Sequence, residues 1–244
     1  MIKWLEDAVF YEVYPQSFRD SNGDGIGDIP GITEKLEYIQ ELGCNALWIN
    51  PCFTSPFYDA GYDVEDYYSV APRYGTNEDL KKLFEAAHQR GMHVLLDLVP
   101  GHTAVTHPWF QESMKAEKNE YTDRYVWTDS LYKRMEDVKG IVSVLRGISP
   151  RPASCGVNCF STQPALNYGF ANITDAGWQQ PTDAPGPMAT REELKNIMRF
   201  WLTLGCDGFR VDMAGSLVKN DEDKKETIRL WQDVRAFLNK EFPE

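Results

Sequence analysis

The sequence of 244 residues predicts an α/β fold built on a parallel sheet. Three observations support this prediction. Strand-like apolar segments alternate with segments of helical period, glycine or proline ends most of them, and polar side chains gather where the strands end. Strands that alternate with helices form parallel sheets. Two arrangements are compatible with this order: a doubly wound open sheet, or part of a (β/α)8 barrel.

Two strand–helix units occupy the first part of the chain. "AVFYEVY" (8–14) is rich in aromatic and β-branched residues and predicts a strand, and apolar residues at helical spacing then predict a helix that ends at Gly43. "NALWINP" (45–51) predicts the second strand. The next helix is expected to begin with Asn77 as its N-cap and to end at Gly91. Four of its apolar residues should face inward: Leu80, Leu83, Phe84 and Ala87.

A long irregular segment follows the third strand. "MHVLLDLVP" (92–100) is a continuous apolar run ended by proline, which predicts a buried strand. Residues 103–188 contain many Pro, Gly, Asn and aromatic residues and show no sustained period. Because such a segment is too long for a loop inside a compact domain, it predicts an inserted subdomain.

The last segment, 189–244, returns to the pattern of residues 1–102. Thr190 and Glu193 have the spacing of a capping box and predict the start of a helix. "DGFRVD" (207–212) predicts the fourth strand, and a final helix carries apolar residues at helical spacing. Four βα units are half of a complete barrel, so we expect at most half of one.

Charge and cysteine content narrow the classes of function. The net charge of −12 disfavours nucleic acid and anionic membranes as partners, and it suits a neutral substrate or a bound cation. No apolar run is long enough for a transmembrane helix, and the N-terminus lacks the pattern of a signal peptide, so we expect a cytoplasmic location.

Five cysteines at irregular spacing do not predict a disulfide framework. Cys155 and Cys159 have the spacing of a local bridge or half a zinc site, but two free thiols are favoured.

A metal loop is predicted at residues 19–28, "RDSNGDGIGD". Oxygen ligands at short intervals, with glycines that let the backbone wrap, suit a hard cation such as Ca²⁺. The expected ligands are the side chains of four residues and one backbone carbonyl: Asp20, Asn22, Asp24, Asp28 and the carbonyl of Ile26. The loop is not an EF-hand, because Gly31 stands where the twelfth-position Glu belongs. The alternative is a solvated acidic turn.

Candidate catalytic residues lie where the third and fourth strands end. Arg210 and Asp212 are two positions apart and so lie on one face of their strand. Asp97 lies late in the third strand, and His102 follows just after it. An arginine beside a carboxylate is expected to lower its pKa and keep it ionised, as a nucleophile requires. The alternative is a structural ion pair. Between the second strand and its helix, "SPFYDAGYDVEDY" (55–67) mixes aromatic rings with carboxylates, which suits sugar binding.

Five motifs in order resemble the α-amylase superfamily of glycoside hydrolases, especially its oligo-1,6-glucosidase and trehalose-synthase-like members. They are "YEVYPQSFRDSNGDGIGD", "GYDVEDY", "DLVPGH", "QPALN" and "GFRVD". The resemblance implies a partial TIM (β/α)8 barrel, the first four βα units with an inserted subdomain after the third strand. It also implies a retaining mechanism on α-glucosidic oligosaccharides derived from starch.

The resemblance also implies roles for individual residues. Asp212 would be the nucleophile, and Arg210 would hold it ionised and oriented. The glucose would contact Asp59, Tyr62 and His102, with Tyr62 as the stacking platform, while Asp97 would support that subsite. Ca²⁺ would be held by Asp20, Asn22, Asp24, Ile26 and Asp28.

Three departures from the family pattern accompany the resemblance. Gly101 replaces the Asn that usually precedes the histidine, Ala165 replaces an Asp of α-1,6-cleaving members, and Gly215 and Ser216 replace a Lys–His pair. The general acid of the family follows a fifth strand, so we expect these four units to lack it and to pair with the missing half or with a second copy. The alternatives are a non-catalytic carbohydrate-binding or interaction module and a transglycosylase on the same scaffold.

Overall fold

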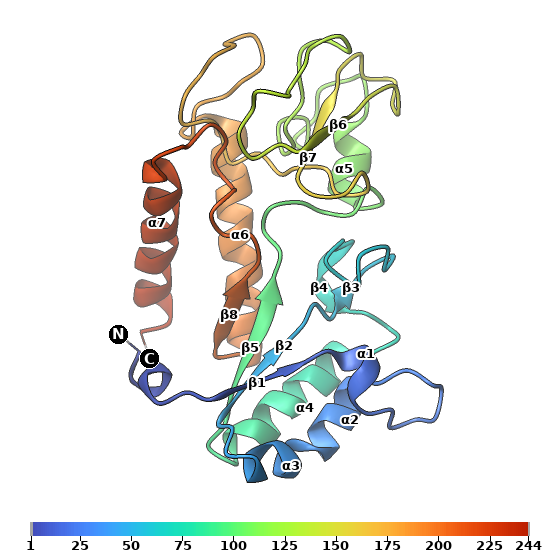
Figure 1. Cartoon of the computed structure of the whole chain (residues 1–244), viewed down its shortest axis with the longest axis vertical. Coiled ribbons are helices and arrows are strands. Elements are labelled where there is room, and N and C mark those ends of the chain that lie inside the picture. Colours follow the sequence, from blue (N-terminus) through green and yellow to red (C-terminus); the bar gives the residue numbers. More distant parts are fainter. Residues whose placement is uncertain (1, 244) are drawn as a thin grey trace.

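The computed structural model describes residues 2–243 and contains a parallel sheet of four strands. These strands are β1 (Phe10–Val13), β2 (Ala46–Ile49), β5 (His93–Leu98) and β8 (Gly208–Val211), and they lie side by side in that order (Figure 1). The predicted parallel α/β sheet is therefore confirmed. Each strand neighbours the next one of the sheet along the chain, with no reversal, which is the order of a barrel and not of a doubly wound sheet.

The register of the sheet positions the polar side chains of its carboxyl edge. Asp97 of β5 pairs directly with Arg210 of β8, and Leu98 pairs with Val211. The backbone N–H of Asp212 then donates to the carbonyl of Leu98 over 2.8 Å, so Asp212 continues the strand for one more residue. Residues that are far apart in sequence are thereby brought to one edge of the sheet.

The helices of the first two units depart in detail from the prediction. The segment before Gly43 forms two short helices, α2 (Ile29–Glu34) and α3 (Leu36–Glu41), after the single turn α1 (Pro15–Phe18). In α4 (Asn77–His88) the N-cap is Thr76, not Asn77 as predicted, because Thr76 and Asp79 form a reciprocal capping box. The amide of Asn77 instead pairs with the backbone of Tyr68 and Val70. The four apolar residues predicted to face inward from α4 are all buried.

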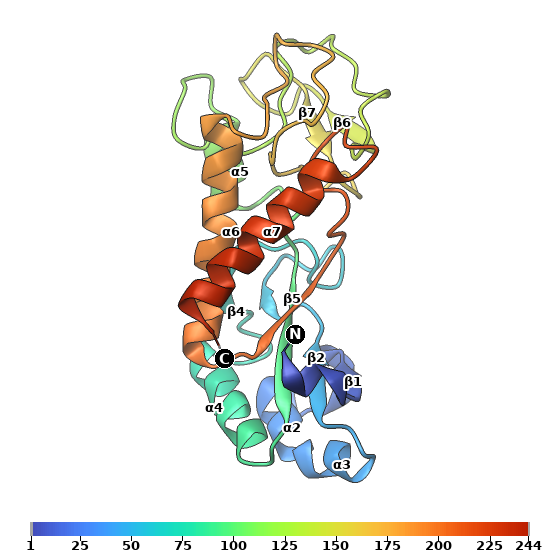
Figure 2. The ribbon, with the colours of Figure 1, turned by 90° about the vertical axis from the view of Figure 1, so that its left-hand side faces the viewer.

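The helix after the insert begins earlier than the sequence suggested. Helix α6 (Pro185–Leu204) begins with prolines in its first turn, whose fixed φ favours a helix start. Thr190 consequently lies inside the helix, and its hydroxyl donates to the carbonyl of Gly186, so the predicted capping box there is wrong. Helix α7 (Lys225–Glu241) lies beside α6, as Figures 1 and 2 both show.

The inserted segment lies beyond the carboxyl ends of the strands and contains little regular structure (Figure 1). Its elements are helix α5 (Pro108–Ser113) and a hairpin of β6 (Ser143–Leu145) and β7 (Cys155–Val157). A second small hairpin, β3 (Phe53–Thr54) with β4 (Asp66–Val70), belongs to the 55–67 region, and a 3-10 turn η1 (Lys3–Glu6) precedes β1. Single β-bridges, such as His102 with Ala165, attach the insert to the end of β5.

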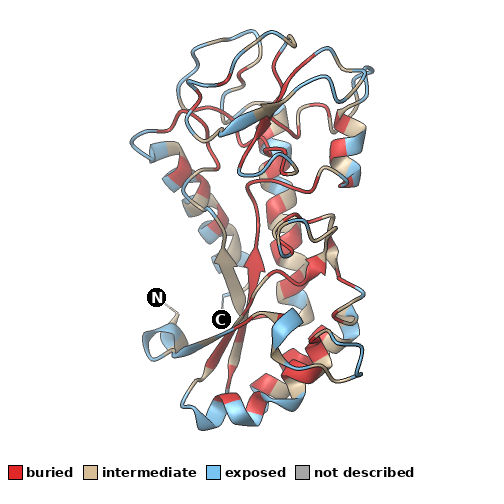
Figure 3. Cartoon of the chain, turned by 45° about the vertical axis from the view of Figure 1, so that its right-hand side comes forward, coloured by how far each residue is buried: buried red, intermediate tan, exposed pale blue. Residues whose placement is uncertain are grey.

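Buried residues form one main core, which runs from the sheet and its helices into the insert, and a smaller core within the insert (Figure 3). The smaller core consists of Val126, Met135, Val138, Ala165 and Phe170. In residues 2–243 the five cysteines are free thiols; Cys155 is buried, whereas Cys159 is exposed. None of the helices in this range combines the length and hydropathy that a membrane span requires.

Candidate active site

Three charged side chains meet at the carboxyl edge of the sheet. One nitrogen of Arg210, Nη1, donates to Asp97 over 3.0 Å and to Asp212 over 2.9 Å. The sequence-predicted pair of Arg210 and Asp212 is thus joined by Asp97 from the neighbouring strand. One guanidinium therefore holds two carboxylates in fixed positions, which is a stronger geometric constraint than a single ion pair.

Asp97 is the buried centre of this network. Its side chain is fully inaccessible to solvent and accepts hydrogen bonds from Trp48 Nε1 at 3.0 Å and from the Tyr62 hydroxyl at 3.2 Å, in addition to Arg210. Burial raises the pKa of Asp97 to about 6, although Arg210 and Trp48 act in the opposite direction. The loss of hydration therefore outweighs the attraction of Arg210, and the ionised carboxylate of Asp97 destabilises the folded state.

The pKa of Asp212 differs in direction from the prediction. We expected Arg210 to lower it, but burial raises it, Arg210 only partly compensates, and the nearby Asp59 raises it further. The sequence shows that a cation lies two residues away, but it does not show how much of the carboxyl is withdrawn from water. Arg210 still orients Asp212, so the geometric part of the prediction holds.

Aromatic rings surround the arginine. The guanidinium lies 4.9 Å from the ring centroid of Trp48 and 6.0 Å from that of Tyr62, both within the range of cation–π attraction. The Tyr62 hydroxyl also accepts from Asn50 at 3.4 Å, and burial raises the pKa of Tyr62 to about 12, so the phenol stays protonated and donates to Asp97. Tyr62 is half-buried, which leaves part of its ring available to a ligand.

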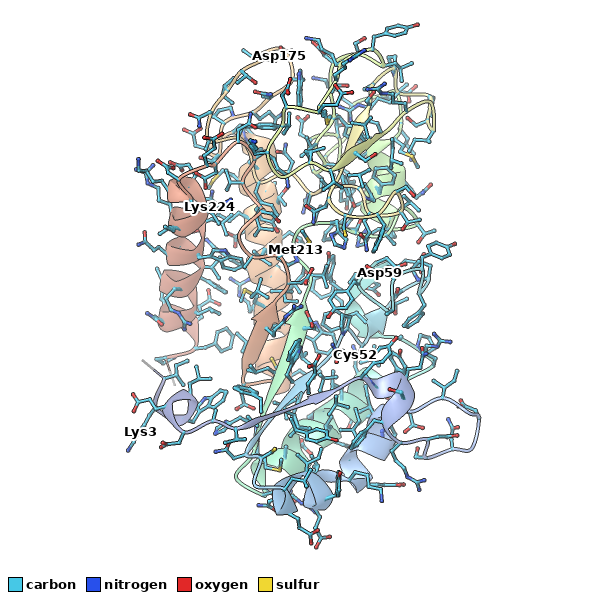
Figure 4. The ribbon with its side chains drawn as sticks, in the orientation of Figure 1. Lys3, Cys52, Asp59, Asp175, Met213 and Lys224 are labelled. Carbon is cyan, nitrogen blue, oxygen red and sulfur yellow. The ribbon has the colours of Figure 1, made fainter. Side chains whose placement is uncertain are left out.

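Asp59 is held by the inserted segment. Gln163, the first residue of "QPALN", donates to Asp59 Oδ2 over 2.6 Å. The loop around Asp59 is shaped by the fully buried Asp63, which accepts from the Ser55 hydroxyl and from the backbone N–H groups of Tyr58 and Asp59. Asp59 and Met213, the residue after Asp212, lie at the same level between sheet and insert in Figure 4.

His102 is less available than the resemblance implies. Its side chain is buried, Nε2 lies 3.0 Å from the Tyr62 carbonyl oxygen, and Nδ1 lies 3.0 Å from the amide nitrogen of Asn158. Burial lowers the pKa of His102 to about 4, so the ring is neutral near pH 7. Both ring nitrogens are thus engaged by the protein, and a contact between this ring and a sugar hydroxyl remains a prediction.

The predicted metal loop is compact, but its oxygens already have partners. Asp20 accepts from the N–H groups of Asn22, Gly23 and Gly25, and Asp24 accepts from that of Ile26. Asp28 caps α2 through Gly31 and binds Ser21. Within residues 2–243 no three His, Cys, Asp or Glu side chains are grouped to hold a metal ion. An ion here would therefore depend on the Asn22 amide and the Ile26 carbonyl as well, a donor set that suits Ca²⁺.

Sequence reasoning missed four residues of the site: Trp48, Asp63, Asn158 and Gln163. Trp48 had a signal, because it lies one position before the end of its strand and a ring nitrogen on a buried strand needs a partner. Gln163 belonged to a recognised motif but was given no role. Asp63 likewise belonged to the motif "GYDVEDY" but was given no role. Asn158 had no periodic or spacing signal, since it lies in an irregular segment and acts through a contact distant in sequence.

Comparison with known proteins gives a consistent result. The family described as "Alpha amylase, catalytic domain" matches residues 12–240. An oligo-1,6-glucosidase of Bacillus sp. (strain F5) is 38% identical over 219 residues, which are 90% of this chain and 40% of the relative. A trehalose synthase/amylase TreS of Mycolicibacterium smegmatis is 40% identical over 250 aligned residues, covering 98% of this chain and 39% of the relative.

Solved structures share the fold as well. The trehalulose synthase MutB from Pseudomonas mesoacidophila MX-45 superposes with a TM-score of 0.80 at 32% identity, and the match covers 98% of this chain and 43% of that one. The chain thus spans about 40% of the length of the curated relatives it matches. The match lies in the N-terminal part of these longer relatives.

Proposed function

The chain belongs to the α-amylase catalytic-domain family, and from this membership we propose that it forms the nucleophile half of a retaining enzyme that acts on α-glucosidic oligosaccharides derived from starch. The observation that carries the proposal is the position of Asp212 at the carboxyl edge of a parallel sheet, fixed by Arg210. Its relatives are glycosidases and related glucosyl-processing enzymes, which supports the reaction class.

In the proposed mechanism, a carboxylate oxygen of Asp212 attacks the anomeric carbon of the bound glucose. The bond from that carbon to the leaving oxygen breaks, and a covalent glycosyl ester forms on Asp212. Arg210 keeps the attacking oxygen aimed at the sugar, since Nη1 holds the other part of the carboxylate at Oδ1. Water or a second sugar then releases the glucose with net retention at the anomeric carbon.

The leaving oxygen needs a proton. We propose that the acid that supplies this proton lies in the part of the catalytic domain that the relatives have and these 244 residues do not cover. The chain covers about 40% of their length, so a second carboxylate from that part would face Asp212 across the glycosidic bond. Tyr62 would stack on the sugar ring, and Asp59 would accept hydrogen bonds from its hydroxyls. His102, whose ring is held by the Tyr62 carbonyl and Asn158, would be the third residue to contact this glucose.

A leaving group that departs without a proton allows a direct test of this chain. A fluorinated α-glucosyl fluoride that labels retaining nucleophiles should add one glycosyl group to Asp212, located by peptide mass spectrometry. Asp212→Asn should abolish the label, whereas Asp223→Asn on an exposed turn should leave it unchanged. A label on a different carboxylate would refute the nucleophile assignment.

A transglycosylase is the second candidate. One relative is a trehalose synthase/amylase, and such a reaction passes the glycosyl group to a sugar instead of to water. In a protein of the relatives' full length, product analysis with maltose separates the two: glucose alone indicates hydrolysis, and new disaccharides indicate transfer. In the same protein Asp212→Asn should abolish turnover of an aryl α-glucoside. A catalytically inactive binding module would bind maltose without forming the covalent label.

We also propose that the 19–28 loop binds Ca²⁺ through Asp20, Asn22, Asp24, Asp28 and the carbonyl of Ile26. The donor set supports this, and the ion would stabilise the turn between α1 and α2 without contact with the substrate. Chelation should lower the melting temperature, and added Ca²⁺ should restore it. An unchanged melt together with no metal in elemental analysis would refute the proposal.

An apolar groove along β8 supports pairing with further barrel sequence. It has a volume of about 390 Å³ and is lined by Leu95, Phe209, Val211, Trp231 and Leu238, among others. β8 is an edge of the sheet, and a closed barrel has no edges. We propose that the next βα unit of the relatives covers this groove. When only the present 244 residues are expressed, light scattering should detect self-association; a monodisperse monomer would count against the pairing.

A further inference from the structure

Asn158 lies at a junction between the insert and two strand ends. Its side chain is buried, and its amide nitrogen is 3.0 Å from His102 Nδ1 and 3.7 Å from the sulfur of Met213. His102 follows β5, and Met213 directly follows Asp212. One amide group therefore contacts two segments at the carboxyl edge of the sheet, one that carries His102 and one that follows Asp212.

The hydrogen-bond pattern fixes the tautomer of His102. Its Nε2 faces the carbonyl oxygen of Tyr62, which can only accept, so Nε2 must carry the proton. The neutral ring then has a lone pair on Nδ1, and only a donor can satisfy it. Asn158 Nδ2 is that donor. The ring is thus clamped between the Tyr62 backbone and the insert.

Packing alone does not explain an asparagine at this place. Its other polar atom, Oδ1, is buried and has no hydrogen-bond partner within the described residues. A buried polar atom without a partner is destabilising, and an apolar side chain of similar size would avoid it. The amide nitrogen is the part of the side chain that makes specific contacts.

Gly101 provides the space that Asn158 occupies. A Cβ atom at position 101 would lie 2.6 Å from Asn158 Nδ2, which is closer than real Cβ contacts allow. Gly101 has no positive φ, so its backbone does not require glycine. The missing side chain at position 101 and the amide of Asn158 are therefore complementary.

We propose that Asn158 is a positioning residue of the sugar site: its amide, in the space left by Gly101, holds His102 as the Nε2–H tautomer against the Tyr62 backbone and links the insert to the segment after Asp212. That the positioned site binds a sugar rests on the proposed function. The insert thereby helps to set the geometry of two loops that belong to the barrel.

The first experiment reads the tautomer and does not depend on activity. The chain contains only four histidines, so ¹⁵N spectra of the histidine rings can be assigned by substitution. The unchanged chain should show His102 with protonated Nε2 and bare Nδ1 at pH 7. Asn158→Asp, which replaces the donor with an acceptor, should protonate Nδ1 as well and raise the pH at which the ring loses its charge. A spectrum and titration identical to the unchanged chain would overturn the inference.

Other charges also act on the His102 ring and are common to both variants. Lys219 disfavours the charged ring and Asp63 favours it, and both are buried. Asn158→Leu, which removes the donor without adding charge, separates the loss of the hydrogen bond from the added carboxylate. It should leave the ring neutral but broaden or shift its signals, because Nδ1 has lost its partner. Sharp signals at their original positions would contradict the clamp.

The second experiment tests complementarity with Gly101. Gly101→Ala should lower the melting temperature, whereas Gly215→Ala, where a Cβ meets nothing within 4 Å, should not. Adding Asn158→Gly to Gly101→Ala should cost less than the sum of the two single changes, because the clash is removed. Strict additivity would overturn the steric part of the inference.

The labelling rate links the clamp to the site. Asn158→Leu should slow covalent labelling by the glucosyl fluoride about tenfold, mainly through weaker binding of the reagent and not through a slower limiting rate. If the unchanged chain does not label while Asn158→Asp protonates both ring nitrogens of His102, the proposed function fails and the positioning role stands. If the chain labels but Asn158→Leu labels equally well, the positioning role fails alone.

Discussion

Replacement of Asp97 by Asn should stabilise the fold at neutral pH while it weakens the site. Asp97 has a pKa of about 6 in the fold against an ordinary value of 3.8. A difference of about two pKa units corresponds to roughly 3 kcal/mol between the two protonation states. Because the folded pKa is raised, stability is fully present below about pH 4 and is lost as the pH rises through 6. Asn resembles the neutral acid and avoids that loss.

The substitution also weakens the contact with Arg210. The amide nitrogen would face Arg210 Nη1 where the carboxylate accepted a hydrogen bond, and this mismatch should take back roughly 1 kcal/mol. The expected net effect at pH 7 is therefore a gain of about 2 kcal/mol for Asp97→Asn. Below pH 4 the wild-type carboxyl is neutral too, so only the mismatch with Arg210 remains and Asp97→Asn should be less stable than wild type by roughly 1 kcal/mol. Covalent labelling of Asp212 should slow, since Arg210 loses the buried anion that anchors it.

Urea unfolding between pH 4 and 7.5, followed by tryptophan fluorescence, measures the effect. The informative quantity is the difference in unfolding free energy between Asp97→Asn and wild type as a function of pH. Glu117→Gln, at an exposed carboxyl in the insert, serves as the control and should show no such pH dependence. A constant difference across this range, or a wild type that is more stable than the variant at pH 7, would refute the reasoning.

Two further predictions follow from the same region. Asp63→Ala should lower the stability by roughly 3 kcal/mol, since it leaves the Ser55 hydroxyl and the N–H groups of Tyr58 and Asp59 without their buried acceptor. Asp63→Asn should lower it less. Equal melting temperatures for Asp63→Ala and wild type would contradict this prediction. Cys159, the exposed cysteine, should be the first thiol alkylated by iodoacetamide. Burial, Asp59 and Asp212 raise the pKa of the Cys159 thiol, so alkylation should accelerate above pH 9. At a given pH it should be faster in Asp212→Asn than in wild type, because the thiolate has lost a neighbouring negative charge. Equal alkylation rates in the two proteins would place Cys159 away from the nucleophile.

The strands and their order were predictable because their signals are local. Short segments rich in apolar, aromatic or β-branched residues marked the four strands within a few residues. The parallel arrangement then followed from their alternation with helices, and it brought Asp97 beside Arg210. Helix starts were less predictable: Asn77 and Thr190 both fit a cap by composition, but Thr76 and Pro185 provide the actual starts.

The electrostatic environment could not be predicted in the same way. The spacing of Arg210 and Asp212 gave the correct contact but the wrong direction for the pKa of Asp212, since burial depends on the whole fold. Asn158 and Gln163 were missed as site residues for a related reason. They lie in a segment without period, and their contacts with His102 and Asp59 cross more than fifty residues of chain.

The raised pKa values are consistent with the proposed chemistry. Asp97 and Asp212 share a single guanidinium, and the charge of Asp59 also acts on Asp212. The cluster therefore has more negative than positive charge, and burial makes that charge unfavourable in the resting protein. The transition state of glycoside cleavage carries positive charge at the anomeric carbon. That charge would relieve the unfavourable interaction next to Asp212, so the site would stabilise the transition state more than the neutral sugar, which is the condition for faster reaction. A lower pKa for Asp212, as first expected, would have left less of this interaction for the transition state.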